Sequence, residues 1–249
     1  MNMNNNNNNN NNKPKYSTNQ EQVLRKIGTH SYSVKLKDDR YKSQLLESIQ
    51  SLYFIPKITI NYLRNEFQLY ASTVQTVQEW LTKNGNGRMS YDTSVKMMAC
   101  LDQQQHILNE KGYSFYTFNT EDLLIIDDNH FICINAKHIC STHEEDNISS
   151  IKSTKNNTNI FFNLSTTYSK DDFCSPELQQ CRRIPNYTIH ISSFYYTFAS
   201  LIFYCLFGER LSEKNKDAFM NTIIYTPLFW FFQKGLQYEP KERKCFFIS

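Results

Sequence analysis

The amino-acid sequence predicts an α+β fold with a small strand-rich N-terminal part and a larger, mainly helical C-terminal part. Three observations support this prediction. Apolar and polar residues alternate in short runs before residue 72, as they do in strands, whereas apolar residues recur at helical spacing across 90–112. The stretch 194–207 is apolar on every side, which a helix tolerates only when other elements surround it.

Length and composition narrow the classes of protein and partner. The chain has 249 residues, of which 40% are hydrophobic, so it can bury a sizeable core. The formal net charge is only +3 and the lysines and arginines form no basic stripe, so no nucleic-acid partner is predicted. Seven cysteines without a C-x-x-C pair argue against a disulfide framework and indicate a reducing, cytoplasmic compartment. The longest apolar stretch falls short of the ~20 residues that a bilayer span needs, so no membrane anchor is predicted.

The N-terminal part is predicted to begin after an Asn-rich tail. Residues 1–18 are nearly pure Asn at their start and cannot bury enough apolar surface to fold, so we expect disorder there. Residues 19–72 are expected to hold two strand pairs. The first pair turns at the Gly-Thr-His-Ser sequence of 28–31, the second turns at 64–66, and a helix over about 42–52 separates them.

Residues 73–249 are expected to be mainly helical, with one hairpin near their middle. A short helix over 73–81 and a long helix over 90–112 come first. Two apolar runs then flank a turn at Asp127 and Asp128, which predicts a hairpin. The two adjacent carboxylates are interpreted as turn residues that point apart into solvent, and not as an acid–base pair.

The rest of the chain is expected to be one long loop followed by helices. The polar, low-complexity segment 141–172 is predicted to be mobile. Residues 193–207 are predicted to form the buried central helix, and two further helical segments surround Pro227. The apolar stretch 227–236 is interpreted as a helix that packs on this part of the fold, in preference to an interaction surface.

The stretch "SFYTFNTEDLLIIDDNHFICIN", residues 114–135, resembles one part of a eukaryotic-type protein kinase. It is similar to the catalytic loop H-R-D-x-K-x-x-N, the hairpin after it and the D-F-G motif that follows. Aligning the family's Asn with Asp122 places Thr117 at the position of the catalytic base. The same alignment places Asn135 at the position of the metal-binding Asp of D-F-G.

Further motifs occur in the order that this family has. The sequence "CSPEL" at 174–178 resembles the A-P-E motif, whose Glu pairs with a late Arg, so Glu177 and Arg243 are predicted to form a structural ion pair. The helix at 193–207 resembles the family's central helix, with Phe194 in place of an Asp. Near the N-terminus, Gly28 matches a glycine of the Gly-rich loop.

The resemblance covers roughly residues 22–249 and implies a protein-kinase-like two-lobed fold. Residues 19–72 would form a reduced, β-rich N-terminal lobe, and 73–249 a mainly helical C-terminal lobe in which 141–172 corresponds to the activation loop. Degenerate kinase-like proteins of large DNA viruses are often rich in Asn, and the chain is similar to them. The resemblance therefore also implies a location in a host cytoplasm or a virion.

The departures from the kinase motifs imply a loss of catalysis. Thr117 cannot serve as the base, and Asn135 lacks the charge that favours Mg²⁺ over water. The family's nucleotide-binding Lys lies on a strand for which there is little room before residue 42, so that Lys35 or Lys37 would have to replace it. Asp122 is the one carboxylate near the expected metal site.

The expected function is therefore that of a pseudokinase, a catalytically impaired kinase-like domain that binds or scaffolds a protein partner. Gly28, Lys35 and Asp122 would support at most weak binding of ATP and Mg²⁺. Two alternatives remain open at this point: a divergent Ser/Thr protein kinase that transfers phosphate from ATP to protein hydroxyls, and a structural virion component.

A group of potential metal ligands follows the hairpin. His138, Cys140 and His143 have a spacing that matches no common zinc pattern. We interpret them as part of an exposed polar loop and predict no metal site there.

Overall fold

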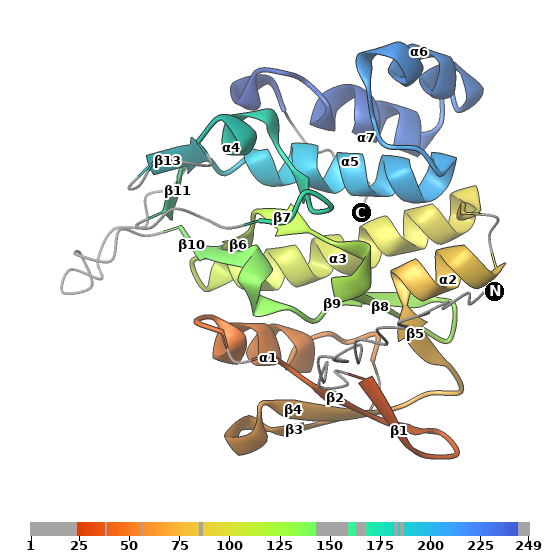
Figure 1. The fold of residues 1–249 in the computed structure, drawn as a ribbon, viewed down its shortest axis with the longest axis vertical. Helices are drawn as coiled ribbons and strands as arrows, with labels where there is room; N and C mark the ends of the chain where they lie inside the picture. The colour runs from red at the N-terminus through yellow and green to blue at the C-terminus, as the bar shows by residue number, and fades with distance from the viewer. Residues whose placement is uncertain are drawn as a thin grey trace, which may run out of the picture.

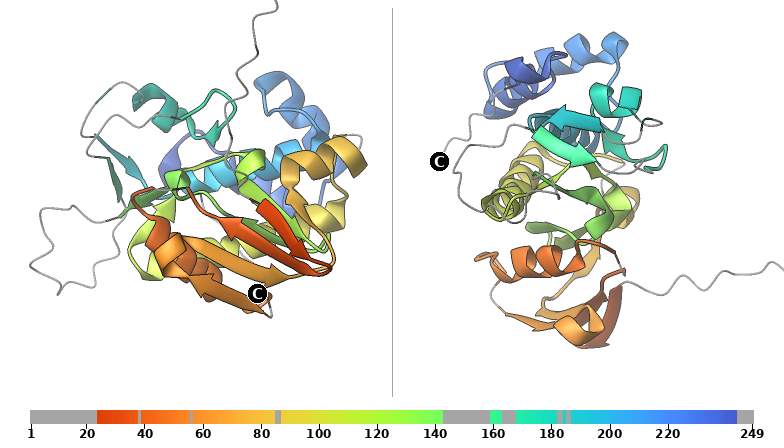
Figure 2. Two further views of the ribbon diagram at one scale, coloured as in Figure 1. Left: turned by 60° about the horizontal axis from the view of Figure 1, so that its bottom comes forward. Right: turned by 90° about the vertical axis from the view of Figure 1, so that its left-hand side faces the viewer.

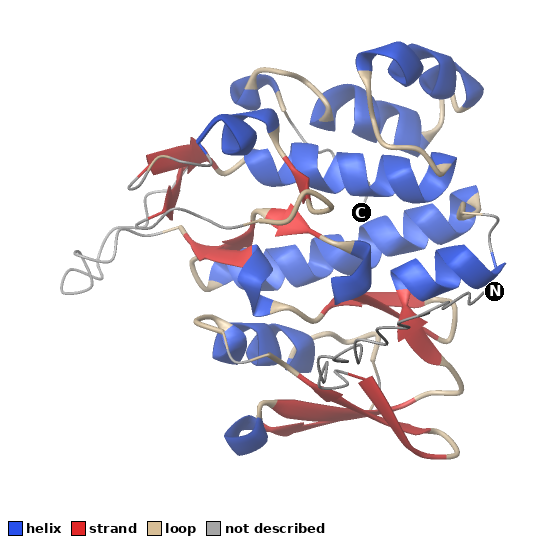
Figure 3. Cartoon of the chain, in the orientation of Figure 1, coloured by secondary structure: helices blue, strands red, loops and turns tan. Residues whose placement is uncertain are grey.

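The computed structural model describes residues 24–37, 39–55, 57–84, 87–142, 159–162, 168–181, 184 and 187–243. Within these ranges the chain has seven α-helices and several small antiparallel sheets, which confirms the predicted α+β class (Figure 1, Figure 3). None of the described helices is long and apolar enough to cross a membrane. The Asn-rich tail predicted for residues 1–18 lies outside the described residues.

The strand-rich N-terminal part is a four-stranded antiparallel sheet with one helix. The sheet has the order β1-β2-β4-β3. Its elements are β1 (Leu24–Gly28), β2 (Ser31–Lys35), α1 (Lys42–Gln50), β3 (Ile58–Asn61) and β4 (Glu66–Tyr70). Val34, Phe67 and Leu69 point into the core from alternate positions, as a half-buried sheet requires. The two predicted strand pairs and the helix between them are confirmed, and they form one end of the molecule (Figure 2).

A three-stranded sheet and two helices form the middle of the molecule. The elements are β5 (Val74–Thr76), α2 (Val77–Asn84), α3 (Tyr91–Glu110), β8 (Leu123–Ile126) and β9 (His130–Cys133). The sheet has the order β5-β8-β9, and α3 packs on β9. The buried amide of Gln104 ties that helix to the sheet, because it both donates to and accepts from the backbone of Cys133.

The hairpin of β8 and β9 turns at Asp127 and Asp128, as predicted. Both residues have positive φ, 50° and 54°, which Asp and Asn tolerate better than most residues. Both residues are exposed turn residues, as interpreted, and their carboxylates also accept hydrogen bonds. Asp127 Oδ1 accepts hydrogen bonds from the backbone N–H groups of Ser72 and Thr73, at 2.7 and 2.8 Å. Asp128 Oδ1 accepts from the indole N–H of Trp80 at 2.8 Å, so the turn also fastens the segment before β5 and helix α2.

Three pairs of very short strands connect distant parts of the chain. They are β6 (Tyr113–Phe115) with β10 (Ile139–Ser141), β7 (Thr117–Phe118) with β12 (Phe173–Cys174), and β11 (Asn159–Phe162) with β13 (Tyr187–His190). Strand β11 lies inside the segment 141–172, for which the sequence predicts a mobile loop; the segment is thus partly a paired strand. Residues 143–158 and 163–167 of that segment lie outside the described residues.

Four helices form the C-terminal end. They are α4 (Pro176–Cys181), α5 (Ser193–Phe207), α6 (Glu213–Thr222) and α7 (Pro227–Gly235). Helix α5 lies between α3 and α7, with most of its residues buried and none of them exposed, which confirms the predicted buried helix (Figure 1). Helix α7 buries Leu228, Phe231 and Phe232, whereas Trp230 on its other side is 51% exposed. The apolar stretch 227–236 therefore both packs on α5 and presents one aromatic ring to solvent.

Candidate functional site

Two short 3-10 turns, each preceded by a capping Asn, shape the candidate site. The turn Thr120–Asp122 follows Asn119, whose Oδ1 accepts from the backbone N–H of Glu121. The turn Ala136–His138 follows Asn135, whose Oδ1 accepts from the backbone N–H of Lys137. Such Asn caps are a common way to start a turn. The pairing of β8 with β9 places the two turns at the same end of the hairpin, so their side chains meet.

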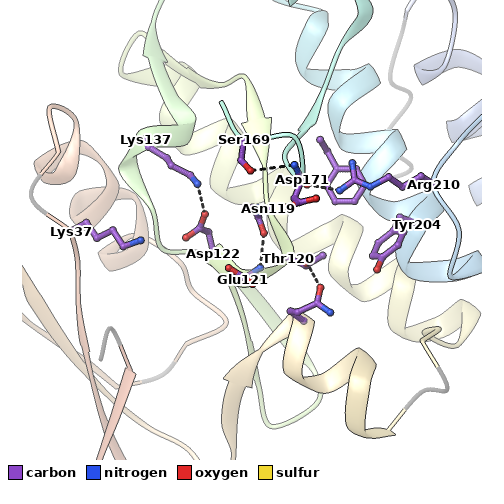
Figure 4. A pocket seen from close by; sticks show the side chains of 12 residues that line it. Lys37, Asn119, Thr120, Glu121, Asp122, Lys137, Ser169, Asp171, Tyr204 and Arg210 are labelled. Carbon is purple, nitrogen blue, oxygen red and sulfur yellow. Dashed lines mark hydrogen bonds and ion pairs between the residues drawn. The ribbon is translucent and has the colours of Figure 1, made fainter. Parts of the chain in front are cut away.

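The side chains of these turns open into a cleft of about 390 Å³ (Figure 4). Positive, negative and aromatic groups line it. The lining residues are Lys37, Gln78, Asn119, Thr120, Glu121, Asp122, Lys137, Ser169, Asp171, Phe173, Tyr204 and Arg210. They come from the N-terminal part, the middle and the C-terminal end, so the cleft exists only in the folded chain.

The carboxylate of Asp122 is the centre of a hydrogen-bond network. It accepts from Asn135 Nδ2 at 2.8 Å, from His138 Nε2 at 2.9 Å and from Lys137 Nζ at 3.0 Å. Burial alone would raise the pKa of this carboxyl group. The hydrogen bonds from His138 and Asn135 and the charge of Lys137 outweigh burial and hold the pKa of Asp122 well below its usual value. Asp122 is therefore ionised at neutral pH.

His138 links this carboxylate to Thr117 through its two ring nitrogens. Its Nδ1 lies 2.7 Å from Thr117 Oγ1, and both side chains are buried, at 0% and 1% exposure. Burial lowers the pKa of His138 in spite of the neighbouring Asp122 carboxylate, so the imidazole is neutral at neutral pH. A neutral ring that donates from Nε2 to Asp122 must accept at Nδ1. The Thr117 hydroxyl therefore donates its proton inward to His138.

Lys137 contacts a second carboxylate. Its Nζ lies 3.7 Å from Asp172 Oδ1, and Asp172 in turn accepts from Asn119 Nδ2 and from the backbone N–H of Ser169, both at 2.8 Å. Burial would lower the pKa of Lys137, but the charge of Asp122 and the hydrogen bond to it raise the pKa above its usual value. Lys137 thus remains charged across the physiological pH range.

The opposite wall of the cleft carries a guanidinium group on aromatic rings. Arg210 lies over the ring of Phe173, at 4.4 Å from the ring centroid, and at 6.0 Å from that of Tyr204. It also donates to the backbone carbonyl of Asp171. The stacking and the hydrogen bond hold the guanidinium in place at this wall.

The structure brings only part of the predicted site together. Asp122 lines the cleft, and Asn135 is buried directly beside it. Lys37 lines the cleft, whereas Gly28 and Lys35 do not belong to its lining and are exposed in β1 and β2. Among the described residues between β2 and α1 there is no strand that could carry the kinase family's lysine.

The predicted ion pair between Glu177 and Arg243 is present. Arg243 Nη2 lies 3.0 Å from Glu177 Oε2, and the Arg243 side chain has no exposed surface. Arg243 also donates to the backbone carbonyl groups of Gln237 and Tyr238, and Ser193 Oγ donates to Glu177. The pair therefore joins α4, the first residue of α5 and the segment after α7.

The interpretation of His138 and Cys140 as part of an exposed loop is wrong, because both are buried. His143 lies outside the described residues. Among the residues that the structure describes, no three His, Cys, Asp or Glu side chains are grouped so that they could hold a metal ion. Sequence reasoning also missed Lys137 and Asp172. A signal for His138 was available, since it directly precedes apolar Ile139 and Cys140.

Comparisons with known proteins leave the function to be argued from this geometry. No protein-family model matches the sequence, and a comparison with curated proteins gives no match either. The arrangement around Asp122 is therefore the main source of functional inference.

Proposed function

We propose that the chain is a protein-kinase-like domain, with a reduced N-terminal lobe, that does not transfer phosphate and acts as a binding or scaffold module for a protein partner. Three relationships support the kinase-like arrangement. The segment that holds Thr117, strand β7 and the turn after it, leads into a hairpin, as a catalytic loop does, and the strand after Asn135 returns to pair with strand β6 before that segment. Glu177 and Arg243, which the kinase alignment matches to the family's structural ion pair, contact each other.

The inward direction of the Thr117 hydroxyl carries the proposal that phosphate is not transferred. A kinase base must face the cleft to accept the proton of a substrate hydroxyl. Thr117 is 1% exposed, is absent from the cleft lining and donates to His138. Neither its chemistry nor its direction suits a general base.

The metal position gives independent support. In the kinase alignment Asn135 replaces the Asp that binds Mg²⁺. Its Nδ2 donates to Asp122 and its Oδ1 accepts from Lys137 N–H, so the side chain is used within the fold. A neutral amide with both ends occupied offers no charge to a divalent ion.

A protein-binding role is supported by apolar side chains exposed around the start of α7. Ile224, Tyr225 and Trp230 are 45%, 80% and 51% exposed. Tyr225 also has φ of 66°, a conformation that is costly for a bulky residue and often marks functional positions. Trp and Tyr are enriched among the residues that dominate protein–protein interfaces.

Two measurements on the full chain test the proposal. With radiolabelled ATP and Mg²⁺ we expect no labelling of the chain or of a generic protein substrate above a no-protein background. Thermal unfolding with and without ATP and Mg²⁺ reports nucleotide binding separately, because a ligand of the folded state must raise Tm. Labelling that disappears in an Asp122→Ala variant would contradict the proposal and support a divergent Ser/Thr kinase.

A further inference from the structure

The cleft contains an ammonium group where the kinase resemblance implies a magnesium ion. Lys137 Nζ lies 3.0 Å from Asp122 Oδ2 and 3.7 Å from Asp172 Oδ1 (Figure 4). Both carboxylate side chains are largely buried, with 14% and 2% of their surface exposed. Two buried carboxylates this close to one cation require that cation for charge balance.

The residues present do not fit a divalent metal ion. Mg²⁺ requires a near-octahedral set of oxygen ligands at about 2.0–2.1 Å. Here both oxygens of Asp122 accept from side chains, and both oxygens of Asp172 accept from Asn119 and Ser169. The oxygen of Asn135 accepts from the backbone of Lys137. A metal ion would have to break several of these bonds and displace the ammonium group.

We infer that Lys137 is a built-in replacement for the divalent cation of this cleft: its ammonium group bridges Asp122 and Asp172 and excludes the metal. Because His138 is neutral, the cluster carries two negative charges and one positive charge. The remaining negative charge and the two oxygens that Lys137 contacts, Asp122 Oδ2 and Asp172 Oδ1, are a latent cation site, because removal of Lys137 would take one partner from each of them. The comparison with a metal rests on the proposed kinase-like fold, whereas the bridging contacts do not.

The test is Mn²⁺ binding to the full chain, measured by isothermal titration calorimetry. For the wild-type chain we expect no saturable binding at millimolar Mn²⁺. For Lys137→Ala we expect one site with a Kd on the order of 10⁻⁴ to 10⁻³ M, as in weak oxygen-ligand sites. The added Asp122→Asn substitution should weaken this binding at least tenfold.

Lys37→Ala is the matched control. Lys37 lines the same cleft, but among the described residues it makes no ion pair with a carboxylate. The substitution removes the same charge and should create no Mn²⁺ site. Metal binding by both lysine variants would overturn the inference, because it would show a general charge effect in place of a specific replacement.

Lys137→Met retains the aliphatic part of the side chain and is the second variant if Lys137→Ala does not fold. The wild-type chain gives a further measurement that needs no substitution, since bound Mn²⁺ broadens nearby NMR signals. Selective broadening around Asp122 in the wild-type chain would overturn the inference. So would a folded Lys137 variant that binds no Mn²⁺, whereas phosphotransfer by the wild-type chain in EDTA, without any divalent metal, would contradict only the proposed function.

Discussion

The Nδ1 atom of His138 lies 2.7 Å from the hydroxyl oxygen of Thr117, and no solvent reaches this contact. The residue aligned with a kinase base is therefore part of an internal hydrogen-bond chain from Thr117 through His138 to Asp122. A buried polar chain of this kind fixes the relative positions of its members when every donor and acceptor is satisfied. Here it holds the loop after β7 against the turn after β9.

Removing the Thr117 hydroxyl should destabilise the fold. In Thr117→Val the acceptor Nδ1 of His138 loses its donor inside the protein, and an unsatisfied buried polar group costs about 1–3 kcal/mol. We expect a decrease of that size in the free energy of unfolding, measured by urea denaturation. Thr117→Ser keeps the hydroxyl group and should lose less than Thr117→Val. Equal stability of wild type and Thr117→Val would mean that the hydrogen bond is not formed in solution.

Removing Arg243 should be more costly. Arg243→Ala leaves the mostly buried Glu177 without its partner, and breaking a buried pair typically costs about 3–5 kcal/mol. Denaturant unfolding of Arg243→Ala, Glu177→Gln and the double variant checks this. Because the two side chains contact each other, the double variant should lose less stability than the sum of the single variants. Additive losses would show that the pair makes no direct contribution.

Introducing at position 194 the aspartate that the proposed kinase alignment places there should unfold or severely destabilise the chain. Phe194 is 2% exposed and packs on the rings of Phe118 and Phe198, with centroid distances of 6.1 and 5.1 Å. Truncation of a buried Phe alone costs about 3–5 kcal/mol, and Phe194→Asp also buries a carboxylate among aromatic rings. Phe194→Leu is the control and should retain most of the stability. A Phe194→Asp variant with wild-type Tm would contradict the packing described here.

The free energy of unfolding should decrease at acidic pH. For both Asp122 and Glu177, burial would raise the pKa, but hydrogen bonds and neighbouring cations lower it below the usual values of 3.8 and 4.5. A lowered pKa in the folded state stabilises the fold above the unfolded-state pKa, and this contribution is lost as pH falls through the folded pKa. We expect the free energy of unfolding to decrease steadily below about pH 4.5. Asp122→Asn should be less stable at pH 7 and should show a shallower pH dependence.

Local patterns explain which elements the sequence predicts correctly. Residues that are adjacent in the chain are enough to predict two elements, the turn at Asp127 and Asp128 and the helix Ser193–Phe207. Strands of two or three residues, such as β7 and β12, contain too few positions to show a period. They form because residues more than fifty positions apart meet in the fold.

The candidate site shows the same limit. Alignment with kinase motifs identifies Asp122, and the retained Glu177 and Arg243 predict their own contact. The alignment does not predict that Lys137 points back to Asp122 or that His138 is buried. These two features depend on the pairing of β6 with β10 and of β8 with β9. A stretch of polar residues predicts an exposed loop from sequence alone. Only the tertiary contacts show that this loop is buried in the interior of the fold.

The last prediction concerns an attempt to introduce catalysis. The double variant Thr117→Asp, Asn135→Asp supplies both aspartates of the kinase pattern, and if residue type alone were missing it should gain phosphotransfer. Loss of a general base typically costs 10²- to 10⁴-fold in rate, so a gain of that size would be measurable with radiolabelled ATP.

We expect no labelling above background from this double variant. Position 117 faces His138 and the interior, so the new carboxylate would contact the buried imidazole and not a substrate in the cleft. The new carboxylate at position 135 would lie beside the ionised Asp122, where Lys137 still takes the place of a metal ion. An active kinase tested in parallel provides the positive control for the assay. Labelling by the double variant that is lost on a further Asp122→Ala substitution would contradict this expectation. It would show that the side chain of residue 117 can turn toward the cleft and that its contact with His138 does not hold it in the interior.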